Sequence, residues 1–370
     1  MLMKPSSVKR VLLLVPSLAG GGAERVITTL LRNLDRSRFE LHLGILEAGG
    51  AYLRDIPGDV EIHPLNIRRV RYAVPGILKL IRMIEPQTVL STLRHLNIAL
   101  GFARPFFPRG TQLILRESVG SVEFADPTAD FGFLSKWLCR HLYKRADRVV
   151  CLSNSLLDDL VENLAVPREK AVRIYNPVEI RRILEFAQSK NNPFRFHGTQ
   201  LLAIGNFTRP KGFDVLLNAL PAVLREHPDA RLTFLGDGPL LGDMIALAQQ
   251  LGILERVNFE GFQSNPWAYM RHADVFVFPS RYEGMPNALL EAVAIGTRAV
   301  ASDCPGGIRE IKDSARNLVL VPPENPQQLS KAIIAALAAD KPKPESLAQV
   351  EKRMEKFTVQ SVVNAYSALL

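Results

Sequence analysis

Short apolar runs alternate with segments of helical period along the whole chain. The strand-like runs cover residues 11–15, 40–46, 60–65, 88–92, 112–117, 148–153 and 171–175 in the first half, and 201–206, 231–238, 257–261, 275–280, 298–303 and 318–323 in the second. Strands that alternate with helices are joined by crossover connections, which place them in parallel sheets covered on both faces. The pattern therefore predicts an α/β protein with two doubly wound domains that face each other.

A domain boundary is indicated by the polar stretch "SKNNPFRFHGTQ", which contains Pro and Gly and precedes a new buried strand. We predict a first domain over residues 1–178, a linker over 179–198 and a second domain over 199–352. Residues 353–370 are predicted to form a C-terminal helix that packs back across the boundary.

Composition places the chain among soluble globular proteins. Its 370 residues are 47% hydrophobic and 22% charged, and no apolar run approaches the roughly 20 residues of a membrane-spanning helix. The N-terminus resembles the start of a signal peptide, but a glycine turn and an amphipathic pattern follow "RVLLLVP", so we interpret it as a first buried strand. Cys139, Cys151 and Cys304 have neither metal-site nor disulfide spacing, which fits a reducing cytoplasm.

Positive charge is concentrated in the first half. Residues 1–178 carry 25 Lys+Arg against 17 Asp+Glu, or +8, and the rest carry 21 against 20, or +1, which together give the net +9. The first half is therefore expected to meet an anionic partner. Residues 68–86 and 131–148 mix basic and apolar side chains, as helices on anionic membranes do, although ordinary core-facing amphipathic helices show the same pattern. No nucleic-acid recognition motif is present.

Glycines 20–22 form a turn between the first strand and the first helix, in "SLAGGGAERV". Such a turn lets backbone amides and a helix N-terminus approach an anion. The spacing matches neither the dinucleotide fingerprint nor a P-loop, and a simple tight turn is an equal alternative.

Two cations, Arg209 and Lys211, follow Gly205 in the loop "GNFTRPKGF", immediately before a helix. The helix macrodipole favours anions at this end, so cations there are explained if a phosphate lies between them and the helix. The alternative is a pair of solvated surface charges.

A second loop-to-helix junction lies in "RYEGMPNALLEAVAIG", residues 281–296. Pro286 suits the first helical turn. The amides of Asn287, Ala288 and Leu289 would then point towards the loop and could bind a phosphate.

Glu283 and Glu291 flank this junction. Glu291 lies one turn inside the helix, where an acid can accept from sugar hydroxyls. Glu283, next to Gly284, follows the carboxyl end of a strand, where open α/β sheets bind ligands. Stabilisation by the helix dipole is an alternative that explains Glu291 but not Glu283.

The second junction resembles the E-x7-E motif of the retaining glycosyltransferases of family 4, which have the GT-B fold of two facing Rossmann-like domains. "GGAERV", "YNPV", "RPKGFDVLLNAL", "GDGP" and "DCPGGIREI" resemble other segments of that family and occur in the same order. The resemblance covers nearly the whole chain. It implies a nucleotide-sugar donor bound mainly by the second domain, retention of anomeric configuration, and no metal or other cofactor.

The resemblance also implies residue roles. Glu291 would hold the ribose hydroxyls, and Glu283 would contact the donor sugar, by positioning it or by stabilising its developing positive charge. Arg209 and Lys211 would neutralise the leaving diphosphate, because fixed cations stabilise charge that grows as a bond breaks. The implied donor-binding set is Gly21, Gly22, Gly205, Arg209, Lys211, Gly261, Phe262, Glu283, Gly284, Asn287, Ala288, Leu289 and Glu291, of which Glu283, Arg209 and Lys211 are the catalytic candidates.

The chain departs from the family pattern at two places. Asn206 stands where many members have Arg, so Arg209 is expected to take over that role. Arg116 and Glu117 stand where many members have His, and we assign them, with His95, to the acceptor or sugar side. A structural role is the alternative for His95.

The predicted function is transfer of a hexose or N-acetylhexosamine from a UDP- or GDP-sugar to a glycan or lipid-linked acceptor. The setting would be cell-envelope polysaccharide or glycolipid synthesis, on the inner face of the cytoplasmic membrane. One alternative is a non-hydrolysing nucleotide-sugar epimerase on a similar scaffold, but that reaction needs acid/base groups from both domains and the carboxylate pair lies in one. The other is a binding protein without turnover, suggested by Asn206 alone.

Overall fold

The computed structural model describes residues 8–19, 21–121, 132–188, 191–340 and 342–370. Contacts divide the chain into two compact units. Unit 1 comprises Met1–Pro177 together with Val359–Leu370, and unit 2 comprises Val178–Thr358.

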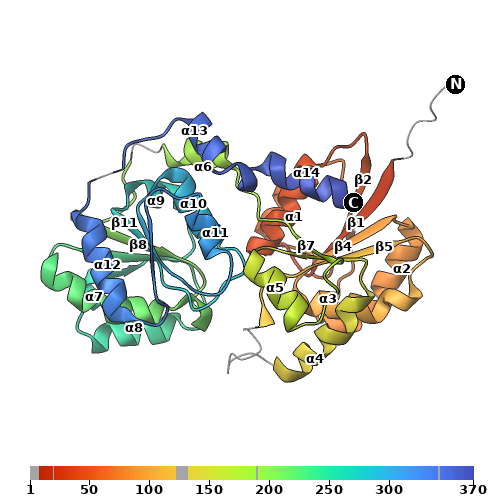
Figure 1. The fold of residues 1–370 in the computed structure, drawn as a ribbon, viewed down its shortest axis with the longest axis horizontal. Helices are drawn as coiled ribbons and strands as arrows, with labels where there is room; N and C mark the ends of the chain where they lie inside the picture. The colour runs from red at the N-terminus through yellow and green to blue at the C-terminus, as the bar shows by residue number, and fades with distance from the viewer. Residues whose placement is uncertain (1–7, 20, 122–131, 189–190, 341) are drawn as a thin grey trace. The chain divides into compact units, whose positions relative to one another are not determined.

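Unit 1 is built on a parallel seven-stranded sheet with the order β3-β2-β1-β4-β5-β6-β7 (Figure 1). Its strands are β1 (Lys9–Val15), β2 (Phe39–Ile45), β3 (Glu61–Pro64), β4 (Thr88–Thr92), β5 (Gln112–Arg116), β6 (Arg148–Cys151) and β7 (Ala171–Arg173). Its helices are α1 (Gly22–Asn33), α2 (Val74–Ile84), α3 (Arg94–Ala103), α4 (Gly132–Leu142), α5 (Asn154–Glu162) and α14 (Val359–Leu369).

Unit 2 repeats the design with a parallel six-stranded sheet in the order β10-β9-β8-β11-β12-β13. Its strands are β8 (Gln200–Ile204), β9 (Arg231–Leu235), β10 (Val257–Phe259), β11 (Val275–Phe278), β12 (Ala299–Ser302) and β13 (Leu318–Val321). Its helices are α6 (Ile180–Ala187), α7 (Phe213–Glu226), α8 (Leu241–Gln250), α9 (Pro266–His272), α10 (Asn287–Ile295), α11 (Ile308–Lys312), α12 (Pro326–Ala338) and α13 (Leu347–Arg353).

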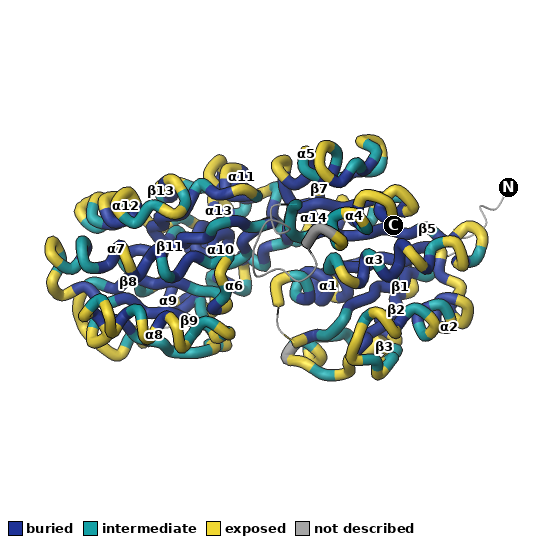
Figure 2. Tube along the Cα trace, turned by 90° about the horizontal axis from the view of Figure 1, so that it is seen from below, coloured by how far each residue is buried: buried dark blue, intermediate teal, exposed yellow. Residues whose placement is uncertain are grey.

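The central strands are buried on both faces. In β1 every residue from Val11 to Val15 is fully buried. Its odd-numbered side chains pack with α1 and α14, for example with Leu30 and Tyr366. Figure 2 shows the strands dark blue, between helices whose outward sides are yellow. Burial on both faces explains why the strands appear in the sequence as continuous apolar runs rather than alternating ones. The predicted pair of doubly wound α/β units is confirmed.

The segment joining the units differs from the predicted linker. Residues 180–187 form α6, which packs against α9 and α10 of unit 2. Its inward side chains include Ile180, Ile183 and Ala187. A linker over 179–198 was therefore too long at its start, because the polar composition begins only after this helix.

The C-terminal segment also divides differently. Residues 347–353 form α13, which contacts α6, whereas α14 belongs to unit 1 and contacts α1. The chain thus passes between the units twice. Val178 and Thr358, beside the two crossing points, form an isolated parallel bridge.

Candidate functional site

Several of the predicted donor-binding residues lie at the switch point of the sheet in unit 2. The strand order reverses between β8 and β11, so the chain turns to opposite faces of the sheet after these two neighbouring strands. Gly205 and Lys211 belong to the loop after β8, and Glu283 and Gly284 to the loop after β11. This is where a doubly wound sheet binds its ligand.

Lys211 and Glu283 form an ion pair across this switch point. Lys211 Nζ donates to Glu283 Oε1 at 2.6 Å, and Ser280 Oγ donates to the same oxygen at 3.0 Å. Both charged side chains are mostly buried, with 24% and 13% of their surfaces exposed. The methylene stem of Lys211 lies over Gly205, where a Cβ would stand 3.3 Å from Lys211 Cδ and Cε. Lys211 and Glu283, which were predicted separately from the sequence, therefore form one ion pair.

Gly212 fixes the direction in which Lys211 leaves the backbone. Residues Arg209–Lys211 form a 3₁₀ turn, and Gly212 (φ 62°) links this turn to α7 in the left-handed conformation. A Cβ on Gly212 would overlap with the carbonyl oxygen of Pro279, at the end of β11. Only glycine fits, because it tolerates the left-handed conformation and lets the two loops approach this closely.

Arg281 ties the two loops together. Its guanidinium group donates to both carboxylate oxygens of Asp214, at 2.8 and 2.7 Å, and to the Arg209 carbonyl at 2.8 Å. Its backbone amide donates to the Pro210 carbonyl at 2.7 Å. Burial alone would raise the pKa of Asp214, but the hydrogen bonds and charge of Arg281 outweigh it and lower that pKa. Asp214 therefore stays ionised and holds Arg281 against the cationic loop.

The loop after β12 supports Glu283 from the other side. Glu283 N donates to the Pro305 carbonyl at 2.9 Å, and Gly307 N donates to the Gly284 carbonyl at 2.8 Å. Gly306 (φ 131°) passes so close that a Cβ there would overlap with the Glu283 carbonyl oxygen. Cys304 lies in the same loop. Burial is the main cause that raises the pKa of its thiol to about 12, and the charge of Glu283 adds to it, so the thiol stays protonated.

Glu291 is buried in α10, only 5% exposed, and accepts a 2.7 Å hydrogen bond from Trp267 Nε1 on α9. Pro286 is the N-cap of α10 rather than its first helical residue. The amides of Asn287 to Leu289 form the first turn, since the helical bonding starts with Leu290 N and the Pro286 carbonyl at 3.1 Å. These three residues therefore open α10, and their role as phosphate donors stays a prediction.

The remaining predicted donor contacts lie nearer the surface. Asn206 and Arg209 are exposed in the loop after β8. Gly261 and Phe262 follow β10, and Phe262, at 75%, is the most exposed of the large hydrophobic residues described. Gly236 N donates to the Gly261 carbonyl at 2.8 Å, which ties this loop to the one after β9.

In unit 1 the glycine turn also follows a switch-point strand, β1, which lies beside β4 in the sheet. Gly21 is the N-cap of α1 and Gly22 its first residue; Gly20 lies outside the described residues. A Cβ on Gly21 would overlap with the Glu24 carboxylate, which folds back over the helix start. The helix start thus already lies beside a carboxylate, which opposes the approach of a second anion.

His95 lies on the second switch-point loop of unit 1, in the first turn of α3. It is exposed, but enough protein surrounds the ring that desolvation lowers its pKa more than the charge of Glu117 raises it. Leu93, between β4 and α3, has φ 74°, a conformation that is strained for a branched side chain. His95 is therefore presented by a strained turn at the carboxyl end of β4.

Arg116 and Glu117 are each 1% exposed and have partners within unit 1. Arg116 donates to Thr92 Oγ1 at 3.1 Å and to Asn176 Oδ1 at 2.7 Å. Glu117 accepts a hydrogen bond from Tyr143 Oη at 2.5 Å. Burial is the main reason why the pKa of Tyr143 lies well above its usual value, and the charge of Glu117 adds to this effect. Their acceptor-side assignment stays a prediction, and the structure gives both side chains internal partners that support the loops after β4 and β5.

Two glycosyltransferase families match the chain, one over each unit. Residues 20–182 match the family described as Glycosyltransferase Family 4, and residues 198–339 match the family described as Glycosyl transferases group 1. The chain belongs to the family 4, group 1 glycosyltransferases.

Relatives agree with this membership, and solved structures share the fold. The N-acetylgalactosamine-N,N'-diacetylbacillosaminyl-diphospho-undecaprenol 4-alpha-N-acetylgalactosaminyltransferase of Campylobacter jejuni is 28% identical, over 88% of this chain and 89% of that protein. The lipopolysaccharide core biosynthesis glycosyltransferase LpsE of Rhizobium meliloti is 27% identical, over 95% and 96%. HepE of Anabaena, solved with UDP and glucose, matches the fold with a TM-score of 0.75 at 19% identity, over 98% and 99% of the two chains. The epimerase alternative finds no support in these comparisons.

Sequence reasoning about this glycosyltransferase missed three residues that position the predicted site. Arg281 holds the loop that carries Arg209 and Lys211, and Trp267 holds Glu291. Gly212 sets the path of the same loop. A signal was present for Gly212, since a glycine after a basic turn and before a helix often marks a left-handed junction. Arg281 and Trp267 gave no comparable signal, because their partners lie 67 and 24 residues away in the chain.

Arg281→Lys in this glycosyltransferase is expected to lower the free energy of unfolding by about 1–2 kcal/mol at pH 7 and to raise the Michaelis constant for the donor several-fold. A lysine cannot reproduce the bidentate contact with Asp214. Because the folded-state pKa of Asp214 is lowered, its contribution is present above the unfolded pKa, about 4, and is lost as the pH falls below that value. Urea denaturation at pH 7 and pH 3 should therefore show a smaller difference between wild type and variant at pH 3.

Arg309→Lys is the matched control. Arg309 makes the same two-pronged contact with Asp303, at 2.9 and 2.9 Å, but its side chain is 79% exposed. An exposed pair contributes roughly 0–1 kcal/mol. Equal losses in the two variants would contradict the bracing role of Arg281.

Proposed function

We propose that this glycosyltransferase uses a UDP- or GDP-sugar, retains the anomeric configuration, requires no metal ion or other cofactor for the transfer, and glycosylates a lipid-linked or cell-surface glycan. The observation that carries the proposal is the Lys211–Glu283 pair, held at 2.6 Å at the switch point of unit 2. The charge of the leaving diphosphate grows as the glycosidic bond breaks, and Lys211 is a fixed cation at the place where doubly wound sheets bind phosphates.

The other groups of unit 2 complete a donor site in this proposal. The first-turn amides of α10 would donate to the diphosphate. Glu291, oriented by Trp267, would accept from the ribose hydroxyls with its carboxylate, and Glu283 would contact the sugar while it orients Lys211. Arg209 would be the second cation. It would take the role of the arginine that many family members have at the position of Asn206. Lys211, Arg209 and the first-turn amides would provide the positive charge that a metal ion supplies in other transferases, which supports metal-independent transfer.

The acceptor class is taken from the relatives. The Campylobacter jejuni protein is named for transfer to a diphospho-undecaprenol-linked sugar, and LpsE for lipopolysaccharide core biosynthesis. The UDP and glucose in the Anabaena HepE structure support a nucleotide-sugar donor. A lipid-linked acceptor would bring the protein to the inner face of the cytoplasmic membrane.

A transfer assay tests this proposal. The protein is incubated with a panel of UDP- and GDP-sugars and membrane lipid extract, and nucleotide release, lipid labelling and the anomeric configuration of the product are followed. We expect nucleotide release that depends on the acceptor, a retained configuration, and an initial rate at 25 °C that a chelator leaves unchanged. An inverted product or an epimerised donor without acceptor dependence would refute it.

Membrane association is proposed for unit 1, within the segments 68–86 and 131–148 that mix basic and apolar side chains. In α2 the apolar residues Ile77, Leu80, Ile81 and Ile84 are buried, so they serve the core. Hydrophobic side chains that remain exposed include Tyr72, Met83, Leu134 and Trp137. Residue 131 lies outside the described residues.

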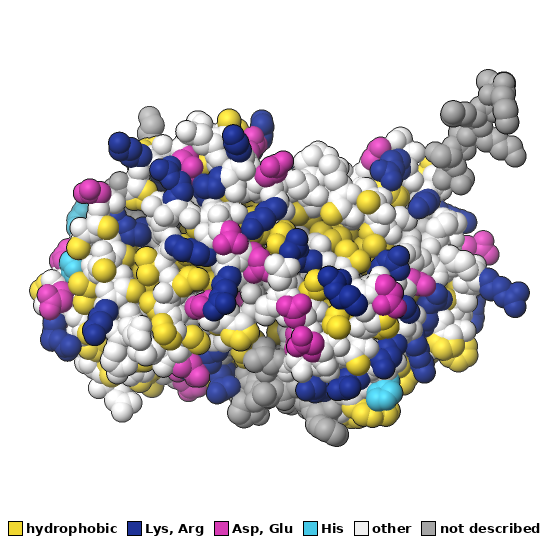
Figure 3. All heavy atoms as spheres, in the orientation of Figure 1, with side chains coloured by type: hydrophobic (Ala, Val, Ile, Leu, Met, Phe, Trp, Pro, Cys, Tyr) yellow, Lys and Arg dark blue, Asp and Glu magenta, His cyan; other side chains and the backbone are white. Residues whose placement is uncertain are grey.

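The exposed hydrophobic residues lie among cations. On α4, Leu134 and Trp137 are neighbours of the exposed Arg140 and the half-buried Lys136. Figure 3 shows Lys and Arg side chains beside hydrophobic ones at the lower right of the view, over α2 and α4. Cations next to exposed aromatic and aliphatic groups suit an anionic lipid surface. None of the described helices is long and apolar enough to span a bilayer.

Liposome flotation tests the membrane surface. The double variant Leu134→Ser, Trp137→Ser is expected to bind anionic vesicles about tenfold more weakly than wild type, since losing roughly 50 Å² of inserted apolar area costs about 1.4 kcal/mol. Binding of the wild type should also weaken in high salt. Ile245→Ser, at a partly exposed position on α8 of unit 2, is the control. Flotation that is independent of salt, or equal in all variants, would remove this part of the proposal.

A further inference from the structure

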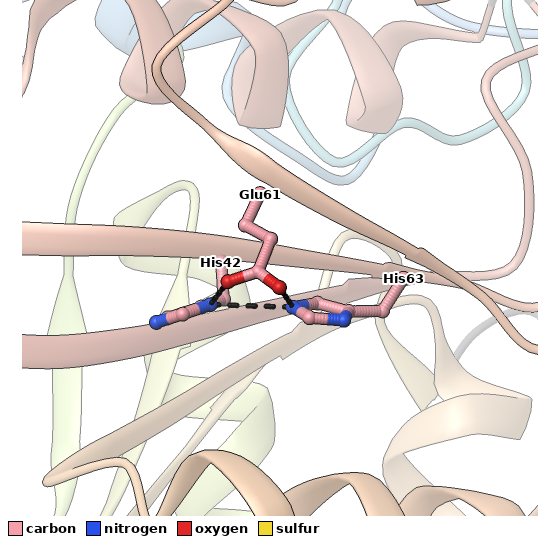
Figure 4. A group of neighbouring side chains, drawn as sticks. All are labelled: His42, Glu61 and His63. Atoms are coloured by element: carbon pink, nitrogen blue, oxygen red, sulfur yellow. Dashed lines mark hydrogen bonds and ion pairs between the residues drawn. The ribbon is translucent and has the colours of Figure 1, made fainter.

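Three side chains that no predicted role uses meet at the edge of the sheet in unit 1. His42 comes from β2, and Glu61 and His63 come from the edge strand β3. The parallel register sets His42 opposite Glu61 and Gly44 opposite His63, so the three side chains project from the same face. Figure 4 shows the Glu61 carboxylate with one oxygen turned to each imidazole.

One possible ligand atom from each of the three side chains lies within 4.8 Å of the other two, and each Glu61 oxygen faces one histidine. His42 Nδ1 lies 3.2 Å from His63 Nε2 and 3.2 Å from Glu61 Oε2, and His63 Nε2 lies 3.8 Å from Glu61 Oε1. Ligand bonds of about 2.0–2.2 Å in tetrahedral geometry place neighbouring donor atoms about 3.3–3.6 Å apart. We propose that His42, Glu61 and His63 form a binding site for Zn²⁺ or a similar first-row transition metal.

Both imidazoles are largely shielded from solvent. His42 is 5% exposed, and the His63 side chain is 11% exposed. The two imidazoles are stacked with their ring centroids 5.4 Å apart, and His42 Nδ1 and His63 Nε2 face each other at 3.2 Å. A bound metal would take the place of this contact between the two nitrogens.

The other nitrogen of His42 already has a carboxylate beside it. His42 Nε2 is buried and makes no hydrogen bond with the described residues, yet Glu40 Oε1 lies 3.2 Å away. Glu40 is exposed, so its carboxylate can rotate to accept from this nitrogen. Histidines that bind metals usually donate their second N–H to such a carboxylate, which fixes the tautomer with the metal-binding nitrogen unprotonated.

A metal bound at this site would link the edge strand β3 to its neighbour β2. β3 has only four residues, and Glu61 and Ile62 are exposed. Three protein ligands leave a fourth position for water. The site lies in unit 1, on strands that carry no residue of the donor site, so it is independent of the proposed function and of the metal-free transfer proposed there.

Metal titration of the untagged, metal-free protein tests the site. Zn²⁺ is titrated in competition with a chromophoric chelator, and Co²⁺ is titrated while its visible absorption is followed. We expect one equivalent of Zn²⁺ with micromolar or tighter affinity, a Co²⁺ spectrum of low coordination number, and a higher melting temperature with Zn²⁺. Absence of a stoichiometric site, or an octahedral Co²⁺ spectrum, would overturn the proposal in favour of a hydrogen-bonded histidine pair.

Variants assign the ligands. His63→Gln and Glu61→Ala should each weaken Zn²⁺ binding by more than about tenfold and abolish the Zn²⁺-induced rise in melting temperature. Glu61 is exposed, so its variant keeps the test valid if His63→Gln folds poorly. His197→Gln and Glu47→Ala, at exposed positions outside the cluster, are the controls. Unchanged affinity in both ligand variants would refute the assignment.

Discussion

Lys211→Met is expected to lower the turnover number of the transfer reaction by about 10²–10³-fold. The methionine retains most of the stem that packs over Gly205 but removes the charge that pairs with Glu283. Loss of one preorganised group that stabilises transition-state charge has an effect of this size. Donor binding should weaken less than turnover falls, because the charge on the diphosphate grows only as the bond breaks. Steady-state kinetics with saturating acceptor, together with calorimetry of donor binding, measure both effects.

Lys331→Met is the control for this prediction. Lys331 is an exposed residue of α12 and takes no part in the loops after β8 and β11. The control should keep wild-type kinetics. A Lys211→Met enzyme with full turnover would show that the ion pair with Glu283 serves the fold and not the leaving group.

Gly212→Ala is expected to lower the free energy of unfolding by about 3 kcal/mol or more and to abolish most activity. The left-handed conformation alone costs a side chain roughly 1–2 kcal/mol. The added Cβ would also overlap with the carbonyl of Pro279, a backbone atom that cannot move without displacing the end of β11. The 3₁₀ turn that carries Lys211 would move as well, so transfer should fall with stability.

Gly252→Ala separates the two costs. Gly252 has φ 68°, close to the φ of 62° at Gly212, but a Cβ there meets no atom within 4 Å. This variant should lose only about 1 kcal/mol and keep its activity. Denaturant unfolding of both variants gives the comparison. Equal losses would mean that the contact with Pro279 is relieved at little cost.

The architecture could be predicted from the sequence because both sheets are buried on both faces. Continuous apolar runs such as "VLLLV" and "VFVFPS" mark β1 and β11 without ambiguity. The helix at 180–187 was missed because its alternation of Ile with Arg and Glu lies next to polar residues that suggested a linker. What decides that segment is its packing on α9 and α10, which no local pattern contains.

The residues of the candidate site were named from the sequence and their roles stay predictions, whereas their contacts could not be predicted. The loops after β8 and β11 were recognised by their residue types and by resemblance, whereas the pairing of Lys211 with Glu283 depends on the strand order β8-β11. The cluster of His42, Glu61 and His63 was invisible for the same reason. Its members are brought together by the register of β2 and β3, and a shift of one residue would turn one strand's side chains to the opposite face.

The placement of α14 has a consequence for the synthesis of the protein. Val362 and Tyr366 are core residues of unit 1, and the Leu370 carbonyl accepts hydrogen bonds from Lys9 Nζ at 3.1 Å and Thr88 Oγ1 at 3.2 Å. Ribosomes make α14 only after all of unit 2. The first unit to emerge is therefore the last to be completed, and until then a nascent chain exposes the apolar groove on α1 and β1 that α14 fills. Chaperones that recognise exposed apolar surface would find this groove throughout most of translation.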